Sequence, residues 1–314
     1  DCWAVLTGDL AVAVTYADVD YLGLATVWWA DLTTGVTGGA DVAVPGAFGL
    51  DLPDRPGTQP LRHRSGGLAL DLLDDPGGTW IIARWRERDG REAALDVRVE
   101  LPVGHESLNV VIPWSDTRFQ YTSKHQARPA HGTLKLGGTV HRIGEPDAVL
   151  SASGAGGRAV DATVDHGAGW GVLDVGRGRW PYRTTWNWGG GAGVALDGRT
   201  VVGLQFGGRW TEGTGFTENG VLVDGKLTKI GTELIWEYDW DSPLHPWRVH
   251  HPDGSLDVVL TPVHDRHTRT EAVVLGTEVH QVFGTWEGTL RTDDGVTVAV
   301  DGLVGFAEES RSRW

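Results

Sequence analysis

The stretch "AALDVRVELPV", residues 93–103, shows the pattern that decides the fold. Apolar side chains alternate along it at Leu95, Val97, Val99 and Leu101. The charged residues between them are Asp96, Arg98 and Glu100. Because successive side chains of a strand point to opposite faces, this stretch has one apolar face and one charged face. It predicts a half-buried strand of an antiparallel sheet.

The same alternation recurs along the chain, whereas helical periodicity is almost absent. Runs rich in β-branched and aromatic residues lie at 10–21, 78–88 and 107–114. Asp-Gly turn signals separate many such runs, in "RDGRE" (88–92), "LDGRT" (196–200), "VDGKL" (223–227), "PDGSL" (252–256) and "DDGVT" (293–297). Asp-Gly supplies the positive φ that tight hairpins need. The sequence therefore predicts an all-β fold of successive hairpins, closed into barrels or stacked sheets that hide strand edges.

The length of 314 residues fits one large β domain or two of ordinary size, and we favour two. We expect a larger N-terminal domain at residues 1–225 and a smaller, barrel-like C-terminal domain at 226–314. Residues 151–161 are rich in Gly, Ala and Ser, and we expect a turn or a flexible lid there. The chain contains no methionine, so we also expect further residues before Asp1.

Charge and cysteine content narrow the partners and the compartment. Acidic residues outnumber basic ones by 42 to 27, for a net charge of -15, and the basic residues are scattered. This argues against nucleic acid and anionic membrane surfaces as partners. The single cysteine, Cys2, cannot form an internal disulfide, which fits a reducing, cytoplasmic setting. No apolar stretch approaches the roughly 20 residues that span a bilayer, so we expect no stable membrane insertion.

Sixteen tryptophans are more than a core of this size ordinarily requires. In "LDVGRGRWPYRTTWNW" (173–188), a strand would place Trp186 and Trp188 on one side and Asn187 on the other. If the first side lines a cavity, it offers π surface to a polyene and stabilises a developing cation by about 0.5–2 kcal/mol per ring. The alternative is that these indoles fill a core. Either arrangement uses the large apolar face and the N–H group of tryptophan.

Asp174, in the same stretch, is a candidate proton donor. Burial against apolar rings would raise the pKa of its carboxyl group and keep it protonated near neutral pH. The guanidinium of Arg177, three residues later, would lower that pKa. The alternative is therefore a structural Asp-Arg pair that fixes a glycine-rich corner.

Three further polar segments carry candidate groups. "KHQARPAH" (124–131) brings together Lys124, which could pair with an acidic substrate group, and His125, which could transfer protons, unless the segment is only a solvated loop. "QFGGRWTEGTGFTEN" (205–219) ends in a Glu-Asn pair that caps a turn or reaches into a pocket. "PVHDRH" (262–267) could bind a metal, but alternation separates His264 from Asp265 and His267. We therefore expect no metal site.

Several long motifs together resemble a known family. They are residues 121–138, 173–188, 203–227, 246–249 and 282–290. The chain resembles, from about residue 3 onward, the bacterial family named domain of unknown function 2804. More distantly it resembles the AttH and hydroxyneurosporene synthase (carotenoid hydratase) group. That group has an Asp before a Trp-rich strand, matched by Asp174 and residues 186–188, and later steps matched by Trp286-Glu287-Gly288 and Gly305-Phe306-Ala307-Glu308.

The resemblance implies two tandem lipocalin-like (calycin-type) β-barrel or sandwich domains with an apolar cavity. Members of the distant group, with fungal relatives among decalin-forming cyclases, add water to alkenes or guide ring closure without metal or organic cofactor. After Asp174 this chain has Val-Gly-Arg-Gly in place of the aromatic-rich step of that group.

The resulting hypothesis is a hydratase or cyclase that acts without a cofactor on an apolar, isoprenoid-like or polyene-like small molecule. The alternatives are a non-catalytic carrier of a hydrophobic ligand and a protein that binds or cleaves glycans. The candidate catalytic residues are Asp174, His125 and Glu218. The candidate ligand-binding residues are Tyr121, Lys124, Arg177, Tyr182, Trp186, Asn187, Trp188, Gln205, Trp210, Asn219, Trp286 and Glu287.

Overall fold

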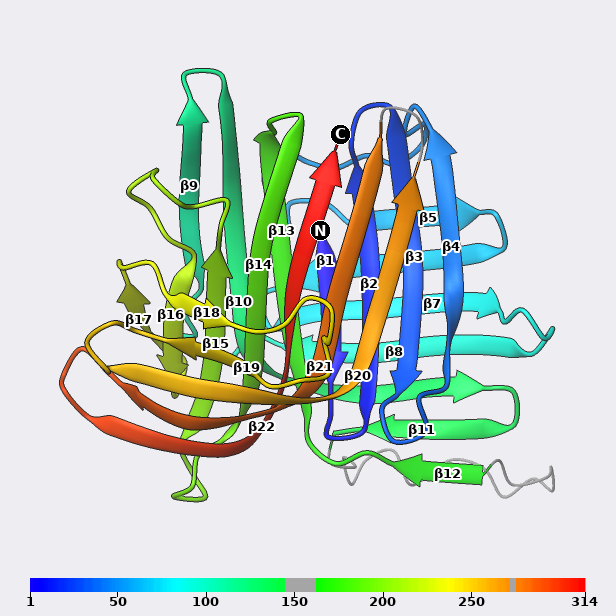
Figure 1. The fold of residues 1–314 in the computed structure, drawn as a ribbon. Coiled ribbons are helices and arrows are strands. Elements are labelled where there is room, and N and C mark those ends of the chain that lie inside the picture. The colour runs from blue at the N-terminus through cyan, green and yellow to red at the C-terminus, as the bar shows by residue number, and fades with distance from the viewer. Residues whose placement is uncertain (145–161, 272–274, 314) are drawn as a thin grey trace. The chain divides into compact units, whose positions relative to one another are not determined.

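The predicted all-β fold is confirmed. The computed structural model describes residues 1–144, 162–271 and 275–313, which form strands β1 to β22 (Figure 1). The segment 151–161, expected as a turn or lid, lies outside the described residues. In the described part of the chain, no helix is long and apolar enough to cross a membrane.

The first sheet is a nearly closed barrel whose strands follow the order β4-β3-β2-β1-β13-β10-β8-β7-β6-β5. Strands β9, β11 and β12 branch from this path. Nine of its strand pairs are antiparallel, namely β1–β2, β2–β3, β3–β4, β5–β6, β6–β7, β7–β8, β8–β10, β9–β10 and β10–β11. The short β11–β12 pair is parallel. The strands are β1 (Cys2–Leu6), β2 (Leu10–Asp18), β3 (Leu22–Asp31), β4 (Thr37–Pro45), β5 (Leu61–Ser65), β6 (Leu68–Asp75), β7 (Gly78–Arg86), β8 (Glu92–Glu100), β9 (Leu108–Ser115), β10 (Arg118–Leu136), β11 (Thr139–Ile143), β12 (Ala162–Asp165) and β13 (Gly169–Arg179).

The second sheet is an antiparallel, curled half-barrel in the order β17-β16-β15-β14-β22-β21-β20-β19-β18. Its centre consists of the long neighbouring strands β20, β21 and β22, coloured yellow-orange to red in Figure 1. The strands are β14 (Arg183–Val194), β15 (Val201–Gly208), β16 (Asn219–Val223), β17 (Lys226–Ile230), β18 (Ile235–Glu237), β19 (Trp247–His250), β20 (Leu256–Glu271), β21 (Gly276–Arg291) and β22 (Thr297–Arg313).

By contacts between Cα atoms, the chain divides into two compact units. The first unit contains residues 1–102 and 128–171, and the second contains 103–127 and 172–314. Strands β10 and β13 therefore run from one unit into the other. This division differs from the boundary expected at residues 225 and 226. That position lies inside the second unit, at the turn between β16 and β17. These two strands pair as a hairpin, so the chain does not change unit there.

Strand β8 has the alternation read from the sequence, with one exception. Leu95, Val97 and Val99 are fully buried in the first unit. The strand ends at Glu100, so Leu101 lies beyond it and is exposed. Arg98, expected on the charged outer face, is buried instead. Its guanidinium donates to both carboxylate oxygens of Asp75 at 2.6 and 2.8 Å, and this pairing compensates its burial.

The Asp-Gly signals form the expected hairpin turns. The glycines all have φ between +74° and +88°, at Gly90, Gly198, Gly225, Gly254 and Gly295. Each lies between two strands that pair antiparallel. Because this region of φ is costly for residues with a Cβ, glycine is the residue these turns require.

The apolar core of the second unit lies on one face of its sheet. It includes Phe206, Trp247, Trp286 and Leu303, which are almost completely buried. Strand β14 crosses this core with three consecutive glycines at 189–191. A Cβ on Gly191 would lie 2.7 Å from the Trp286 ring. The glycines therefore let large side chains pack directly on the strand backbone.

Candidate functional site

Strand β10 carries a row of polar side chains at residues 120–126, in the part of the strand that belongs to the second unit. Gln120, Thr122, Lys124 and Gln126 alternate along it and are all buried. Burying polar groups is costly unless each finds a partner. The groups that these four side chains contact therefore define the candidate functional site.

Lys124 is paired with a carboxylate and lies over an aromatic ring. Its Nζ is 2.8 Å from Oδ1 of Asp174 on β13, and the Lys124 side chain is only 4% exposed. The same Nζ is 4.4 Å from the ring centroid of Trp188, within cation–π range. Burial alone would lower the pKa of Lys124, but the carboxyl groups of Asp174, Glu218 and Glu308 together raise it. Lys124 is therefore a fixed positive charge at neutral pH.

Glu308 on β22 lies between two strands that both supply it with hydrogen-bond donors. Nε1 of Trp186 on β14 donates to its Oε1 at 2.8 Å, and Nε2 of Gln281 on β21 donates to its Oε2 at 2.7 Å. Burial raises the pKa of Glu308, and the Asp174 carboxylate adds to the effect, while the Trp186 bond and the charge of Lys124 oppose it. The net shift is upward, so burial dominates.

Glu218, immediately before β16, is the second buried acid. Nε1 of Trp210 donates to its Oε2 at 2.8 Å. Its Oε1 is buried and has no hydrogen-bond partner in the described structure. Burial raises the pKa of Glu218, and the Asp174 carboxylate adds to the effect, whereas Lys124 lowers it. A buried carboxyl group whose pKa is raised is suited to donate a proton. We call Lys124, Asp174, Glu218 and Glu308 the carboxyl cluster.

Gln205 on β15 connects the Trp188 ring with the polar row of β10 and with Glu218. Its Oε1 accepts hydrogen bonds from Nε1 of Trp188 at 3.1 Å and from Nε2 of Gln126 at 3.0 Å. Its Nε2 donates to the carbonyl of Glu218 at 3.2 Å. The side chain is completely buried, and its bond to the Glu218 carbonyl holds the backbone at that residue.

Four partly buried tryptophans form a row beside the cluster. Trp180 lies 6.4 Å from Trp186, which lies 5.8 Å from Trp210, which lies 5.7 Å from Trp114, all measured between ring centroids. The rings are tilted at 39° to 57° to their neighbours, within the usual range for aromatic pairs. We call these four residues the tryptophan row. Two of its members donate their N–H groups to the two buried acids described above.

The structure does not bring His125 and Tyr121 to the cluster. Both alternate with the buried row of β10 and therefore point to its other face. Nε2 of His125 is 3.0 Å from Oγ of Ser123, and the Tyr121 hydroxyl donates to Asn109.

Four other expected ligand-binding residues also lie elsewhere. Tyr182 and Glu287 are exposed, and Arg177 donates to the carbonyl of Gly176 at 2.8 Å. Trp286 belongs to the apolar core, where its Nε1 donates to the carbonyl of Gly190 at 3.0 Å.

Asn219 and Asn187 have distinct places. Oδ1 of Asn219 accepts from the Gly207 backbone N–H at 2.8 Å, so it holds two strands together. Asn187 helps to line a separate polar pocket of about 230 Å³ in the second unit. There its Nδ2 donates to the Tyr238 hydroxyl and its Oδ1 accepts from Nε of Arg209, both at 3.1 Å.

Comparison with known proteins identifies the family. The model of the family described as "Domain of unknown function (DUF2804)" matches residues 1–314. The chain belongs to this family. A search of the curated proteins finds no match.

Two solved structures show similarity to this DUF2804 chain. Kievitone hydratase from Nectria haematococca has 10% sequence identity and a TM-score of 0.44, over 100% of this chain and 88% of its own. A protein assigned as AttH from Nitrosomonas europaea has 14% identity and a TM-score of 0.39, over 98% of this chain and 91% of its own. These values are low, so neither name is carried over to this chain.

Several residues of the site were missing from the sequence-based candidates. They are Glu308, Gln281, Gln126, Thr122, Trp114 and Trp180. Alternation along residues 120–126 could have grouped Thr122 and Gln126 with Lys124. Glu308 was present in a motif of the family resemblance but was not selected. Nothing in the sequence connects Trp114 and Gln281 to the site, because their proximity results from strand pairing over long sequence distances.

Proposed function

We propose that the second unit is a proton-transfer enzyme of the hydratase or isomerase type, acting on an apolar, unsaturated small molecule. The observation that carries this proposal is Glu218. Its carboxyl group is buried, its pKa is raised, and its Oε1 has no hydrogen-bond partner in the described structure. It is held at the N–H edge of Trp210, a member of the tryptophan row.

Proton donation to a carbon–carbon double bond needs an acid that is still protonated near neutral pH. Burial raises the pKa of both Glu218 and Glu308 and so favours the protonated form that can donate. Asp174 was the first candidate from the sequence, but its carboxylate is paired with the Lys124 ammonium. In the proposal Asp174 is therefore the counter-ion of Lys124. The proton donors are Glu218 and Glu308.

The chemistry balances with the groups at hand. A glutamic acid gives its proton to one alkene carbon, the π electrons form the new C–H bond, and the other carbon becomes cationic. The oxygen of a water molecule then adds to this cation, and its excess proton returns to the glutamate. Loss of a proton from a neighbouring carbon instead yields an isomer. In both cases the acid is regenerated.

The tryptophan row supports the cationic stage. An indole face stabilises a nearby cation by about 0.5–2 kcal/mol, with the larger value in a desolvated setting. Because Trp186 and Trp210 also hold the two acids, a substrate on their faces would lie close to both proton donors. The same surface would serve a carrier that performs no chemistry, so carrier function is the competing proposal.

The test uses a panel of unsaturated isoprenoid alcohols, including geraniol and farnesol, with the saturated analogue 3,7-dimethyloctan-1-ol as the control. Binding is followed by tryptophan fluorescence and chemistry by mass spectrometry after incubation in D₂O. We expect carbon-bound deuterium in the unsaturated compounds and none in the saturated one, after the hydroxyl deuterium has been exchanged back in H₂O. Equal binding of both without deuterium would favour the carrier. Unchanged fluorescence with every compound would contradict both proposals.

A further inference from the structure

The β20–β21 hairpin places a set of metal-ligating side chains on one face, away from the carboxyl cluster. His267 lies directly opposite His280 in the register of the two strands. Asp265 lies two residues before His267, and Glu278 two residues before His280, so alternation puts all four on the same face. His264 packs against Phe283 instead, with ring centroids 6.4 Å apart.

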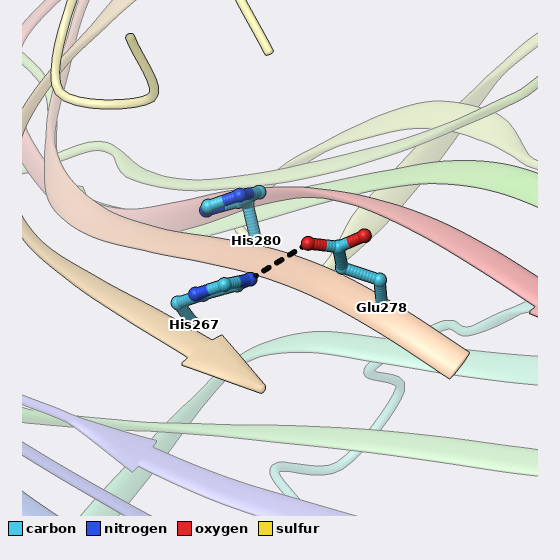
Figure 2. A group of neighbouring side chains, drawn as sticks. All are labelled: His267, Glu278 and His280. Carbon is cyan, nitrogen blue, oxygen red and sulfur yellow. Dashed lines mark hydrogen bonds and ion pairs between the residues drawn. The ribbon is translucent and has the colours of Figure 1, made fainter. Parts of the chain in front are cut away.

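Three of these side chains converge, as Figure 2 shows. One ligand atom from each of His267, Glu278 and His280 lies within 4.8 Å of the other two. Nε2 of His267 is 3.1 Å from Oε1 of Glu278, and the two imidazole rings are stacked with centroids 4.2 Å apart. A tetrahedral metal with bonds near 2.0–2.1 Å needs ligand atoms about 3.4 Å apart. Small side-chain rotations close the remaining gap.

A second carboxylate orients one of the histidines. Oδ2 of Asp265 lies 2.8 Å from Nδ1 of His280, and Oδ1 of Asp265 is buried without a hydrogen-bond partner in the described structure. Because Nδ1 is held by the carboxylate, Nε2 is the nitrogen of His280 that remains for a ligand. Metal-binding histidines commonly have such a carboxylate behind them, which fixes the ring and strengthens its basicity.

The surroundings keep His280 rigid. The Trp240 ring meets it edge-on at 4.6 Å, and the guanidinium of Arg311 covers the Trp240 ring at 3.7 Å. Arg269 is a positive group near the ligands, with Nη1 3.9 Å from Oε1 of Glu278. At this distance the pair is weak and partly exposed, so a divalent ion can displace it.

We propose that His267, His280 and Glu278 bind a divalent transition metal of the zinc class. Two imidazoles and one carboxylate form a donor set that zinc uses in proteins, and three protein ligands leave a fourth position for water or another oxygen ligand. This metal site is independent of the proton-transfer proposal, because it shares no residue with the carboxyl cluster.

The test titrates the full, metal-free chain with Zn²⁺ by calorimetry and with Co²⁺ by visible absorption. We expect one saturable equivalent and a Co²⁺ spectrum of tetrahedral intensity. His267→Ala and Glu278→Gln should weaken binding more than 100-fold, and Asp265→Asn about 10–100-fold, as for other carboxylates behind metal-bound histidines. His264→Ala is the matched control, on the same strand but outside the group, and should bind as the wild type does.

Circular dichroism in the presence of chelator confirms that each variant is folded, and the near-isosteric Glu278→Gln guards against loss of structure. The proposal is overturned if the wild type shows no saturable binding. It is also overturned if His267→Ala and Glu278→Gln, both folded, bind as tightly as the wild type. In that case the two histidine–carboxylate contacts are hydrogen bonds only.

Discussion

Nζ of Lys124 lies 2.8 Å from Oδ1 of Asp174, and this ion pair between a buried lysine and a half-buried aspartate joins β10 to β13 within the second unit. Removing one partner of such a pair leaves the other charge in a setting of low polarity. Lys124 also faces the Trp188 ring, so its charge makes a cation–π contact within the site.

The first prediction concerns this pair. Asp174→Asn should lower the free energy of unfolding by about 1–3 kcal/mol, because Lys124 loses its hydrogen-bonded counter-ion. The loss stays moderate because Glu218 or Glu308 can ionise and take over as the counter-ion of Lys124. Adding Lys124→Met should recover part of the loss. Urea unfolding of the two single variants and the double variant measures the coupling, and strictly additive effects would contradict it.

The second prediction concerns pH. Glu218 has a raised pKa in the folded chain, so between its ordinary value of 4.5 and its folded value the native state binds more protons than the unfolded state. Its contribution to stability therefore falls as pH rises through that range and is constant above it. Lys124, whose pKa is raised, contributes fully throughout this range.

Glu218→Gln removes this titration. The stability of the wild type relative to the variant should therefore decrease between about pH 5 and about pH 8. Unfolding in urea at both pH values checks the sign. The idea is refuted by a difference that stays constant or increases with pH.

The third prediction concerns catalysis. Glu218→Gln and Glu308→Gln should each reduce deuterium incorporation into unsaturated isoprenoid alcohols by about 10²–10⁴-fold, the usual contribution of a general acid. Glu92→Gln, at an exposed ion pair with Arg86, is the control and should keep full activity. Rates measured by mass spectrometry decide the matter. Undiminished rates in both variants would remove the glutamates from the mechanism.

The fourth prediction separates a core tryptophan from one in the tryptophan row. Trp286→Ala should cost about 3–5 kcal/mol of stability, since it leaves a cavity in the apolar core. Trp186→Ala should cost less, because this ring is only partly buried, but it should abolish the fluorescence response to geraniol. Thermal melts and fluorescence titrations of the two variants test both statements. Equal stability losses would show that the two rings do not differ in this way.

Much of the fold was predictable because its signals are local. The alternation at Leu95, Val97 and Val99 needs only neighbouring residues, and so does the positive φ at Gly198. Arg98 was misjudged for the opposite reason. Its partner, Asp75, belongs to another strand, so the ion pair that allows its burial cannot be read from the sequence around it.

The candidate site was only partly predictable. Lys124, Asp174 and Glu218 were recognised as chemically suitable residues, but their meeting depends on strand pairing between distant segments. The same limit applies to the tryptophans. Alternation placed Trp186 and Trp188 on one face, yet only the tertiary structure distinguishes that face from the core that contains Trp286.

The glycine run of β14 has a consequence for any redesign of this protein. On one side the Trp286 ring rests on Gly191, and on the other a Cβ on Gly190 would lie 2.5 Å from Nε2 of Gln126. Strand β14 therefore lies between the apolar core on one face and the carboxyl cluster on the other. Changes in side-chain volume at Trp286 would shift β14. The shift would also move Trp186 on the same strand, whose indole donates to Glu308. Selection for a new substrate could thus act through the core.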